Sequence, residues 1–344
     1  MQKSGFAVAV VLLLLAIVLI QFAATPLVAQ DFLTPTLPII YATLAPDPML
    51  AALAADYPRV DCSTSALPLQ RLIACEVLGV ACVWVAQWGG ESGIWPSDAD
   101  MLPDGDGDQI ARIRASGTHD AYMNLIAGNA DLILVARAPS QDEFDAADAA
   151  GVRLDMQPVA RDAFVFVVNS ENPRGDFTLD EIRAVYAGQI TSWGALGVET
   201  PLSDDPANPI RPYIRDRDSG SQELMNALVM RGMPMIDAPN LVMRTMIGLT
   251  SSVEWDRAGI GYSVYYYTVF IAPADDIKLA AIDGTLPTTF TIADGSYPLV
   301  TDVYAVIRAD AAADSPAARL RDWLLTGTGQ AVVAESGYVP VTLE

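Results

Sequence analysis

Three short motifs of small and hydroxylated residues have the composition of an anion-binding site. They are Cys62-Ser63-Thr64-Ser65, Ser116-Gly117-Thr118 and Ser219-Gly220-Ser221, and each precedes a sequence that predicts a helix. The first four backbone N–H groups of a helix have no intrahelical partner, and the helix dipole favours negative charge there. Hydroxyl groups add donors, and a glycine lets a ligand approach the backbone closely. The motifs together predict an oxyanion site, although each one alone is also explained as an ordinary N-cap.

Two arginines accompany these motifs. Arg215 stands four residues before Ser219, and Arg137 ends the strand-like sequence ADLILVAR. A guanidinium group presents a planar fork of donors that suits a tetrahedral oxyanion. Arg215 also belongs to a charged run with residues 216–218, so a solvated turn held by salt bridges is the alternative interpretation. We expect the Arg215 side chain to lie exposed in a cleft when no ligand is bound.

The composition argues against several classes of function. The 344 residues carry a formal charge of -22, with 42 acidic and 20 basic side chains, which disfavours nucleic acid and anionic membrane surfaces as partners. A Ser-His-Asp site would have to use the single histidine, His119, without a nucleophile-elbow motif. The acidic run at 104–108 lacks the glutamate that a calcium loop needs, because Ala115 occupies that position, so we interpret it as a solvated loop. We expect no metal, no cofactor and no catalytic residues.

The N-terminal region predicts export. An apolar run from Phe6 to Ile20 is followed by small residues that end near Ala29, so residues 1–29 are interpreted as a signal peptide. An uncleaved anchor is the alternative. Residues 30–56 are rich in Pro and Thr and are predicted to be a linker. The rest would work outside the cytoplasm, where disulfides are permitted, and three cysteines leave at least one unpaired.

The body of the chain predicts an α/β fold. Residues 111–136 read as strand, helix and strand, which is typical of a parallel α/β unit. The apolar run at 163–169 has the length of a strand. Thr178 and Glu181 form a capping-box pattern at the start of a further helix.

The order of these motifs resembles that of the extracytoplasmic phosphate-binding proteins of ABC importers, the PstS type. The resemblance covers nearly all of residues 58–344. The stretches that carry it are VDCSTSALPL, SGTHDAYMNLIAGNADLILVARAPS, PVARDAFVFVVNSENP, LDEIRAVYAGQITSWGALG, IRDRDSGSQELMNAL, AGIGYSVYYY and TGTGQAVVAESGYVPV.

The resemblance implies a two-lobe type II periplasmic binding protein fold. Each lobe would contain a mostly parallel sheet flanked by helices. Lobe one would combine residues 57–160 with 263–344, and lobe two would comprise 161–262. Two crossovers, near 158–163 and 259–265, would form the hinge, and closure would bring helix N-termini from both lobes onto one ligand.

The resemblance also implies the ligand and the residues that contact it. The protein would be a monomer that captures inorganic phosphate and delivers it to a membrane ABC permease. The alternatives are a binder of another tetrahedral oxyanion, such as sulfate or molybdate, and a surface phosphate sensor without a transport role. The implied ligand contacts are Ser63, Thr64, Ser65, Ser116, Arg137, Arg215, Ser219, Gly220 and Ser221.

Two positions depart from the family pattern. Cys62 stands where the first loop usually carries glycine. Arg137 stands where some members have an aspartate that accepts the phosphate proton, while other members have arginine. The acceptor in this chain must then come from elsewhere, and the candidates are Asp61, Asp216 and Asp218, together with backbone carbonyls.

Overall fold

The computed structural model describes residues 48–86, 91–96 and 112–341. The predicted signal peptide or anchor, most of the predicted linker and the acidic run at 104–108 lie outside these ranges. Within them, no helix combines the length and the apolar character that crossing a membrane requires.

The main sheet is built around one long strand, β5 (Leu154–Asn169). Its strand order is β1-β4-β13-β5-β10-β7, and β11 and β14 also pair with β5. The pairs β1–β4 and β10–β7 are parallel, whereas β5 and β13 pair antiparallel with their neighbours. The α/β prediction is confirmed, with a mixed sheet whose parallel pairs lie on either side of β5. The other strands of this sheet are β1 (Val60–Cys62), β4 (Leu132–Val135), β7 (Arg211–Pro212), β10 (Gly259–Val264), β11 (Ile277–Leu279), β13 (Val300–Arg308) and β14 (Val339–Pro340).

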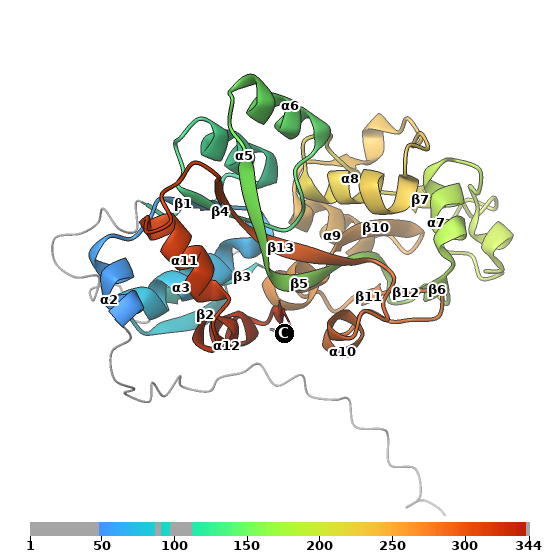
Figure 1. The fold of residues 1–344 in the computed structure, drawn as a ribbon. Helices are drawn as coiled ribbons and strands as arrows, with labels where there is room; N and C mark the ends of the chain where they lie inside the picture. The colour runs from blue at the N-terminus through green and yellow to red at the C-terminus, as the bar shows by residue number, and fades with distance from the viewer. Residues whose placement is uncertain (1–47, 87–90, 97–111, 342–344) are drawn as a thin grey trace, which may run out of the picture. The chain divides into compact units, whose positions relative to one another are not determined.

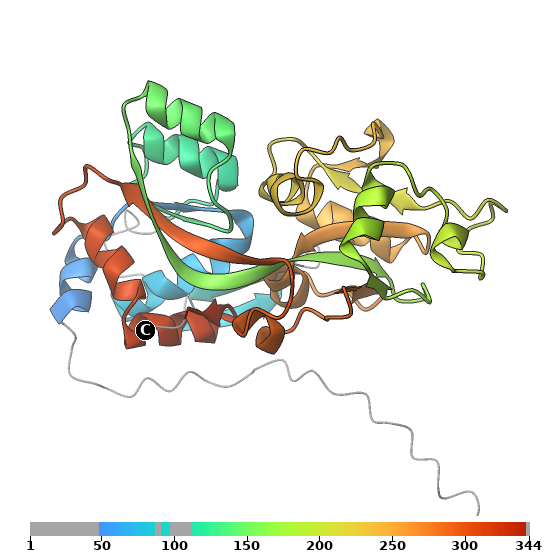
Figure 2. The ribbon, with the colours of Figure 1, turned by 45° about the vertical axis from the view of Figure 1, so that its right-hand side comes forward.

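β5 passes from one half of the sheet to the other at Ala163. Ala163 pairs with Val300 of β13, and the next residue, Phe164, pairs with Val264 of β10. We call the half with β1, β4 and β13 the first lobe and the half with β7 and β10 the second lobe (Figures 1 and 2). Helices of the first lobe are α2 (Pro48–Ala55), α3 (Leu67–Leu78), α5 (Thr118–Ile126), α6 (Gln141–Ala149), α11 (Pro316–Leu324) and α12 (Gly327–Ser336); those of the second are α7 (Leu179–Tyr186), α8 (Gly220–Leu224) and α9 (Met246–Glu254).

Smaller elements complete the fold. The short helical turns are η1 (Thr64–Ala66), η2 (Trp193–Leu196), η3 (Met225–Met230), η4 (Pro239–Leu241), η5 (Tyr267–Ile271) and α10 (Thr289–Ala293). Three two-stranded sheets pair β2 (Cys82–Ala86) with β3 (Ser92–Pro96), β6 (Asp176–Phe177) with β12 (Ala281–Ile282), and β8 (Ile214–Arg215) with β9 (Val242–Met243).

Local sequence signals account for the ends of two helices. α3 ends at Gly79, whose φ of 68° places it in the left-handed conformation that a glycine C-cap favours. Thr178 and Glu181 form the expected capping box at α7: the Glu181 N–H donates to Thr178 Oγ1 at 3.1 Å, and the Thr178 N–H donates to Glu181 Oε2 at 2.8 Å.

Two boundaries differ from the prediction. The linker was expected to reach residue 56, but residues 48–55 form helix α2, whose Leu53 is fully buried in the core. Residues 263–344 were assigned to lobe one as a whole, but β11 pairs with the second-lobe end of β5 and β12 pairs with β6. This pairing covers an edge of β5 that would otherwise leave backbone groups unpaired.

The two connections between the lobes meet at Asp162. This aspartate is 1% exposed, and its Oδ1 accepts the backbone N–H groups of Ala163, at 2.8 Å, and of Tyr266, at 3.0 Å. Burial raises the pKa of Asp162 from 3.8 to about 7. Tyr266 in turn stacks on Tyr338, with ring centroids 3.7 Å apart. The junction is therefore a packed structure and not a pair of free loops.

Two of the three cysteines form a disulfide bond, and the third is free. Cys75, near the end of α3, is disulfide-bonded to Cys82 at the start of β2. Cys62 is free and buried. The expectation that at least one cysteine stays unpaired is confirmed.

Candidate functional site

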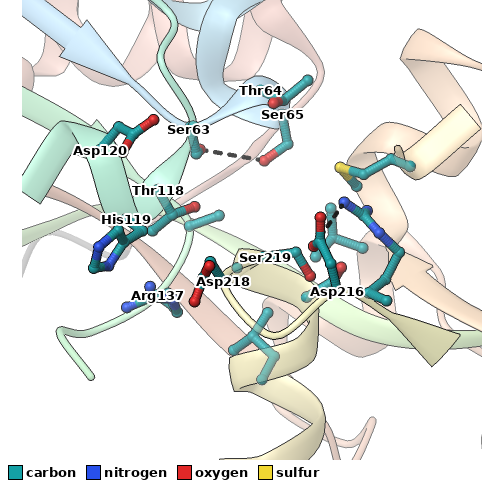
Figure 3. A pocket seen from close by; sticks show the side chains of 18 of the residues that line it. Ser63, Thr64, Ser65, Thr118, His119, Asp120, Arg137, Asp216, Asp218 and Ser219 are labelled. Atoms are coloured by element: carbon teal, nitrogen blue, oxygen red, sulfur yellow. Dashed lines mark hydrogen bonds and ion pairs between the residues drawn. The ribbon is translucent and has the colours of Figure 1, made fainter. Parts of the chain in front are cut away.

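One pocket of about 300 Å³ lies between the lobes, and all nine predicted ligand contacts line it (Figure 3). The three motifs come from different parts of the chain and still meet here. Whether each residue touches a ligand remains a prediction, but the structure brings all of them together. The further lining residues, which we did not assign as ligand contacts, are Gly117, Thr118, His119, Asp120, Ala136, Asp216, Asp218, Leu224, Met246 and Val264.

The first loop follows β1 and starts the η1 turn. Ser63 and Ser65 are both buried, and their Oγ atoms lie 3.4 Å apart. The Ser63 N–H donates to the Leu134 carbonyl at 2.9 Å, which attaches the loop to β4. Tyr338 donates its hydroxyl to the Ser65 carbonyl at 3.0 Å. Fixed from both sides in this way, the loop holds its serine hydroxyls against the pocket.

Ser116 does not have free donors. Its backbone N–H donates to Asp61 Oδ1 at 3.0 Å, and its hydroxyl donates to Asp61 Oδ2. Asp61 is fully buried and also accepts from Asn124 Nδ2 at 2.8 Å and from the Cys62 N–H at 2.8 Å. Asp61 is absent from the pocket lining, so its proposal as the acceptor of a ligand proton is wrong: its oxygens hold Ser116 in place.

Thr118, in the motif Ser116-Gly117-Thr118, lines the pocket but was not among the predicted ligand contacts. Gly117 is the N-cap of α5, with a φ of 95° that favours glycine, and Thr118 is the first helical residue. The Thr118 side chain is nearly buried and lies against Gly220 of the opposite lobe: a Cβ at Gly220 would stand 2.5 Å from Thr118 Oγ1. Its hydroxyl group in the first turn of a predicted helix, two residues after Ser116, could have indicated from the sequence that it lines the pocket.

The α8 motif supplies donors from the second lobe. Ser219 is the N-cap, and its Oγ accepts the Gln222 N–H at 3.1 Å. Ser221 is buried, and its Oγ has no hydrogen-bond partner among the described residues. One serine therefore serves as the cap, while the other presents a buried hydroxyl to the pocket.

Arg215 is buried, contrary to the expectation of an exposed side chain. It is 8% exposed, and its Nε and Nη2 donate to the carbonyls of Met243, at 2.9 Å, and Arg244, at 3.1 Å. Its own N–H donates to the Tyr262 hydroxyl at 2.9 Å. Arg215 is buried because β8 pairs in parallel with β9, which places Arg215 beside Met243. Burial lowers the pKa of the Arg215 guanidinium, and Nη1 has no protein acceptor among the described residues.

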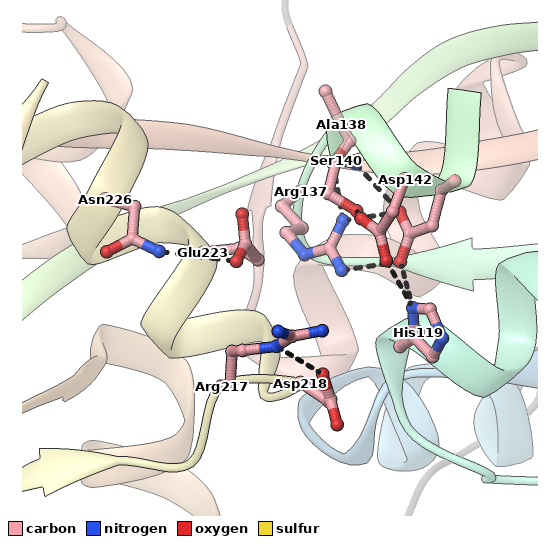
Figure 4. Close-up of polar contacts among 10 residues, drawn as sticks. His119, Arg137, Ala138, Ser140, Asp142, Arg217, Asp218, Glu223 and Asn226 are labelled. Carbon is pink, nitrogen blue, oxygen red and sulfur yellow. Dashed lines mark hydrogen bonds and ion pairs between the residues drawn. The ribbon is translucent and has the colours of Figure 1, made fainter. Parts of the chain in front are cut away.

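Arg137 is also buried, and Glu143 binds both of its Nη atoms. Nη1 lies 2.8 Å from Glu143 Oε2, and Nη2 lies 2.8 Å from Oε1. Figure 4 shows Arg137 on the same side as His119, Ser140 and Asp142. Arg137 Nε is buried without a partner among the described residues.

Two of the acceptor candidates line the pocket. Asp216 has an Oδ1 that is buried without a hydrogen-bond partner within the described residues, 3.8 Å from Arg215 Nη2. Asp218 is largely exposed, with Arg217 Nε 3.6 Å away. Within the described residues, no group of three or more His, Cys, Asp or Glu side chains is placed to hold a metal ion.

A known family matches most of the chain. The sequence fits the family model of the PBP superfamily domain over residues 106–324. The chain belongs to the PBP superfamily. This membership agrees with the two-lobe organisation around β5.

Relatives within the superfamily are similar along much of their length. The phosphate-binding protein PstS of Staphylococcus saprophyticus is 26% identical over 193 residues, which cover 55% of this chain and 58% of that protein. The PstS protein of Staphylococcus aureus is 24% identical over 298 residues, covering 78% of this chain and 87% of that one. The chain thus spans somewhat over half of the first relative's length and most of the second's.

Solved structures share the fold. A putative phosphate ABC transporter substrate-binding protein from Clostridium perfringens, with bound phosphate, has a TM-score of 0.58 at 21% identity, covering 82% of this chain and 98% of that one. An ABC-type phosphate transport receptor from Vibrio cholerae has a TM-score of 0.56 at 19% identity, with coverages of 81% and 98%. These matches confirm the predicted type of fold for this member of the PBP superfamily.

Proposed function

We propose that this protein is an extracytoplasmic substrate-binding protein that captures inorganic phosphate between its lobes and delivers it to a membrane ABC permease. The observation that carries the proposal is the convergence of two helix mouths, from opposite lobes, on one pocket that also contains Arg215. Helix N-termini and a guanidinium group are the donors that proteins use for tetrahedral oxyanions. The names of the two PstS relatives and of the two solved proteins described above refer to phosphate, which supports the same ligand.

The pocket also supports phosphate over sulfate. Near neutral pH, phosphate carries a proton that sulfate lacks. The buried Oδ1 of Asp216 has no donor within the described residues, so it can accept that proton. A sulfate oxygen at the same place would face a carboxylate oxygen that repels it and stays unpaired. Asp216 is therefore our choice of acceptor among the three carboxylates considered from the sequence.

Calorimetric titration with phosphate, sulfate and molybdate tests the proposal. We expect phosphate to bind and sulfate at equal concentration not to displace it. Asp216→Asn replaces the acceptor by an amide, so we expect this variant to bind sulfate more tightly than the wild type does. The matched control is Asp218→Asn, whose exposed carboxylate should leave the selectivity unchanged. Displacement of phosphate by equimolar sulfate in the wild type would make the protein a general oxyanion binder.

The cellular role needs separate tests. N-terminal sequencing of the exported protein should find a start near residue 30, and an intact Met1 on membrane-bound protein would instead support an anchor. Phosphate uptake by cells that lack the protein should fall if it serves a permease. Unchanged uptake, combined with phosphate binding in solution, would favour a sensor without a transport role.

A further inference from the structure

Glu143 encloses the guanidinium group of Arg137. Glu143 is fully buried, and its two oxygens accept from the two Nη atoms in a bidentate pair. The same carboxylate accepts the Ser140 N–H at the start of α6, at 2.9 Å, and lies 3.1 Å from His119 Nδ1. Nη1 also donates to the Ala138 carbonyl at 2.8 Å. Arg137 therefore has a fixed orientation, and protein acceptors take three of its five N–H groups.

Two N–H groups of Arg137 remain for a ligand: Nε–H and the second N–H of Nη2, neither of which has an acceptor among the described residues. Nε is buried and has no partner among the described residues. It lies 3.8 Å from the position that a Cβ on Gly220 would occupy, so it belongs to the part of the pocket where the two lobes approach each other. Arg215 differs, because backbone carbonyls bind its Nε and Nη2 while the nearest carboxylate oxygen, on Asp216, is 3.8 Å from Nη2.

We propose that Glu143 is a specificity-determining residue that cancels the charge of Arg137, so that this side of the pocket offers the anion a hydrogen bond without a net positive charge. The inference rests on the proposed function. The two oxygens of Glu143 lie 2.8 Å from the two Nη atoms of Arg137. A ligand in the pocket therefore experiences the pair as a group with almost no net charge. A pocket wall that carries no net charge attracts a dianion little more than a monoanion. Glu143 thereby limits the binding of fully ionised anions such as sulfate.

Glu143→Gln tests the proposal because the amide keeps the shape of the side chain and removes its charge. The unpaired charge of Arg137 should tighten sulfate binding by about tenfold, which is a modest share of the attraction between unit charges at this range. Phosphate, which is partly monoanionic near neutral pH, should gain less. A residue that only supports the loop would give the opposite sign, namely weaker binding of both anions.

The chain contains a matched control. Glu181 is the third residue of α7, as Glu143 is of α6, and both its oxygens lie 2.7 Å from Nη2 of the preceding Arg174. It also accepts the N–H of its helix N-cap. Neither residue of that pair lines the pocket. Glu181→Gln should therefore alter stability without altering the affinity for either anion.

The double variant Arg137→Gln/Glu143→Gln keeps the test decisive if the single variant does not fold. It removes both charges and the two free donors of Arg137, while the amide of the new side chain supplies N–H donors in their place. Affinity should therefore fall by no more than about tenfold, the effect of one hydrogen bond. A loss of a hundredfold or more would mean that the charge of Arg137 binds the anion, and this would overturn the proposal. Weaker or unchanged sulfate binding by Glu143→Gln would overturn it as well. A wild-type protein that binds neither anion would refute the proposed function instead.

Discussion

The two sides of the pocket hold their donors in different ways. On the first-lobe side, buried carboxylates stand behind the motif residues: Asp61 binds Ser116, and Glu143 binds Arg137. On the second-lobe side, Arg215 is held by backbone carbonyls, and Ser221 has a hydroxyl without a partner among the described residues. The comparison indicates that the first lobe contributes a preformed wall of low net charge. The second lobe contributes Arg215, which lacks a bidentate carboxylate and has its nearest carboxylate oxygen, on Asp216, 3.8 Å from Nη2.

The largest effect is expected for Arg215→Ala, which removes the arginine that the second lobe contributes to the pocket. Loss of the guanidinium should weaken phosphate binding by about 2–5 kcal/mol. Unlike an exposed residue, it should also lower the free energy of unfolding by about 1–3 kcal/mol, because the partly buried carbonyls of Met243 and Arg244 lose their donors. Titration calorimetry and thermal unfolding measure the two effects. Arg217→Ala is the control, since that side chain is 92% exposed, and wild-type phosphate affinity in Arg215→Ala would remove Arg215 from the site.

The junction between the two sides gives the second prediction. The pKa of Asp162 is raised from 3.8 to about 7, so the folded protein binds this proton more tightly than the unfolded chain does. Stability from this group is fully present below the unfolded pKa and is lost as the pH rises through the folded pKa, by at most about 4 kcal/mol. The groups that face it, Tyr265, Tyr266 and Tyr338, are uncharged over this range.

Asp162→Asn should flatten this part of the pH profile, because the amide oxygen can still accept both backbone N–H groups. The measurement is the free energy of unfolding of both proteins between pH 4 and pH 8. Parallel profiles for the variant and the wild type would show that Asp162 does not titrate as described.

Gly220→Ala tests the place where the two sides touch. The added Cβ would stand 2.5 Å from Thr118 Oγ1 and 3.2 Å from its Cβ, so the helix mouths should move apart. We expect phosphate binding to weaken by about 1–3 kcal/mol, the usual effect of overpacking. Adding Thr118→Ala removes the hydroxyl and should restore part of the loss. Gly194→Ala is the control, since a Cβ there meets nothing within 4 Å, and equal losses in both variants would contradict this account.

The smallest effects are expected for two serine variants, one on each side of the pocket. They separate a serine that supports the structure from one that is free to bind the ligand. Ser116→Ala leaves Asp61 with fewer donors, so it should reduce stability by about 1–3 kcal/mol while changing affinity little. Ser221→Ala should reduce affinity by about 0.5–1.5 kcal/mol and leave stability nearly unchanged. The same two measurements serve both variants. If Ser116→Ala lost affinity without losing stability, the supporting role of Asp61 would be refuted.

Much of the site could be predicted because its signals are local. A serine or glycine at the start of a helix indicates unpaired backbone donors whatever the tertiary context, so the three motifs could be identified from neighbouring residues. What could not be predicted depends on distant pairs. Asp61 lies 55 residues before Ser116, and Met243 lies 28 residues after Arg215. No local pattern shows that one serine is already engaged or that one arginine is buried.

The separation of the partners along the chain also explains why the capping box of α7 was predicted and the Arg137–Glu143 pair was not. Thr178 and Glu181 are three residues apart, so their capping box could be recognised in the sequence. Arg137 and Glu143 are separated by a turn whose geometry the sequence does not specify, and their pairing emerges only when α6 is placed. The fold class followed from alternating strands and helices, whereas the return of β11 and β12 to the second lobe required the observed pairing.

The hydroxyl of Tyr338 has a consequence for the order in which the protein assembles. It supports the Ser65 carbonyl from 273 residues further along the chain, and Tyr338 also stacks on Tyr266 at the junction. The first loop is among the earliest parts of the pocket to be synthesised, but its support is among the last. In a chain that emerges N-terminus first, the loop therefore waits for this contact. The first loop gains this support only after Tyr338 has emerged and the contact over 273 residues has formed.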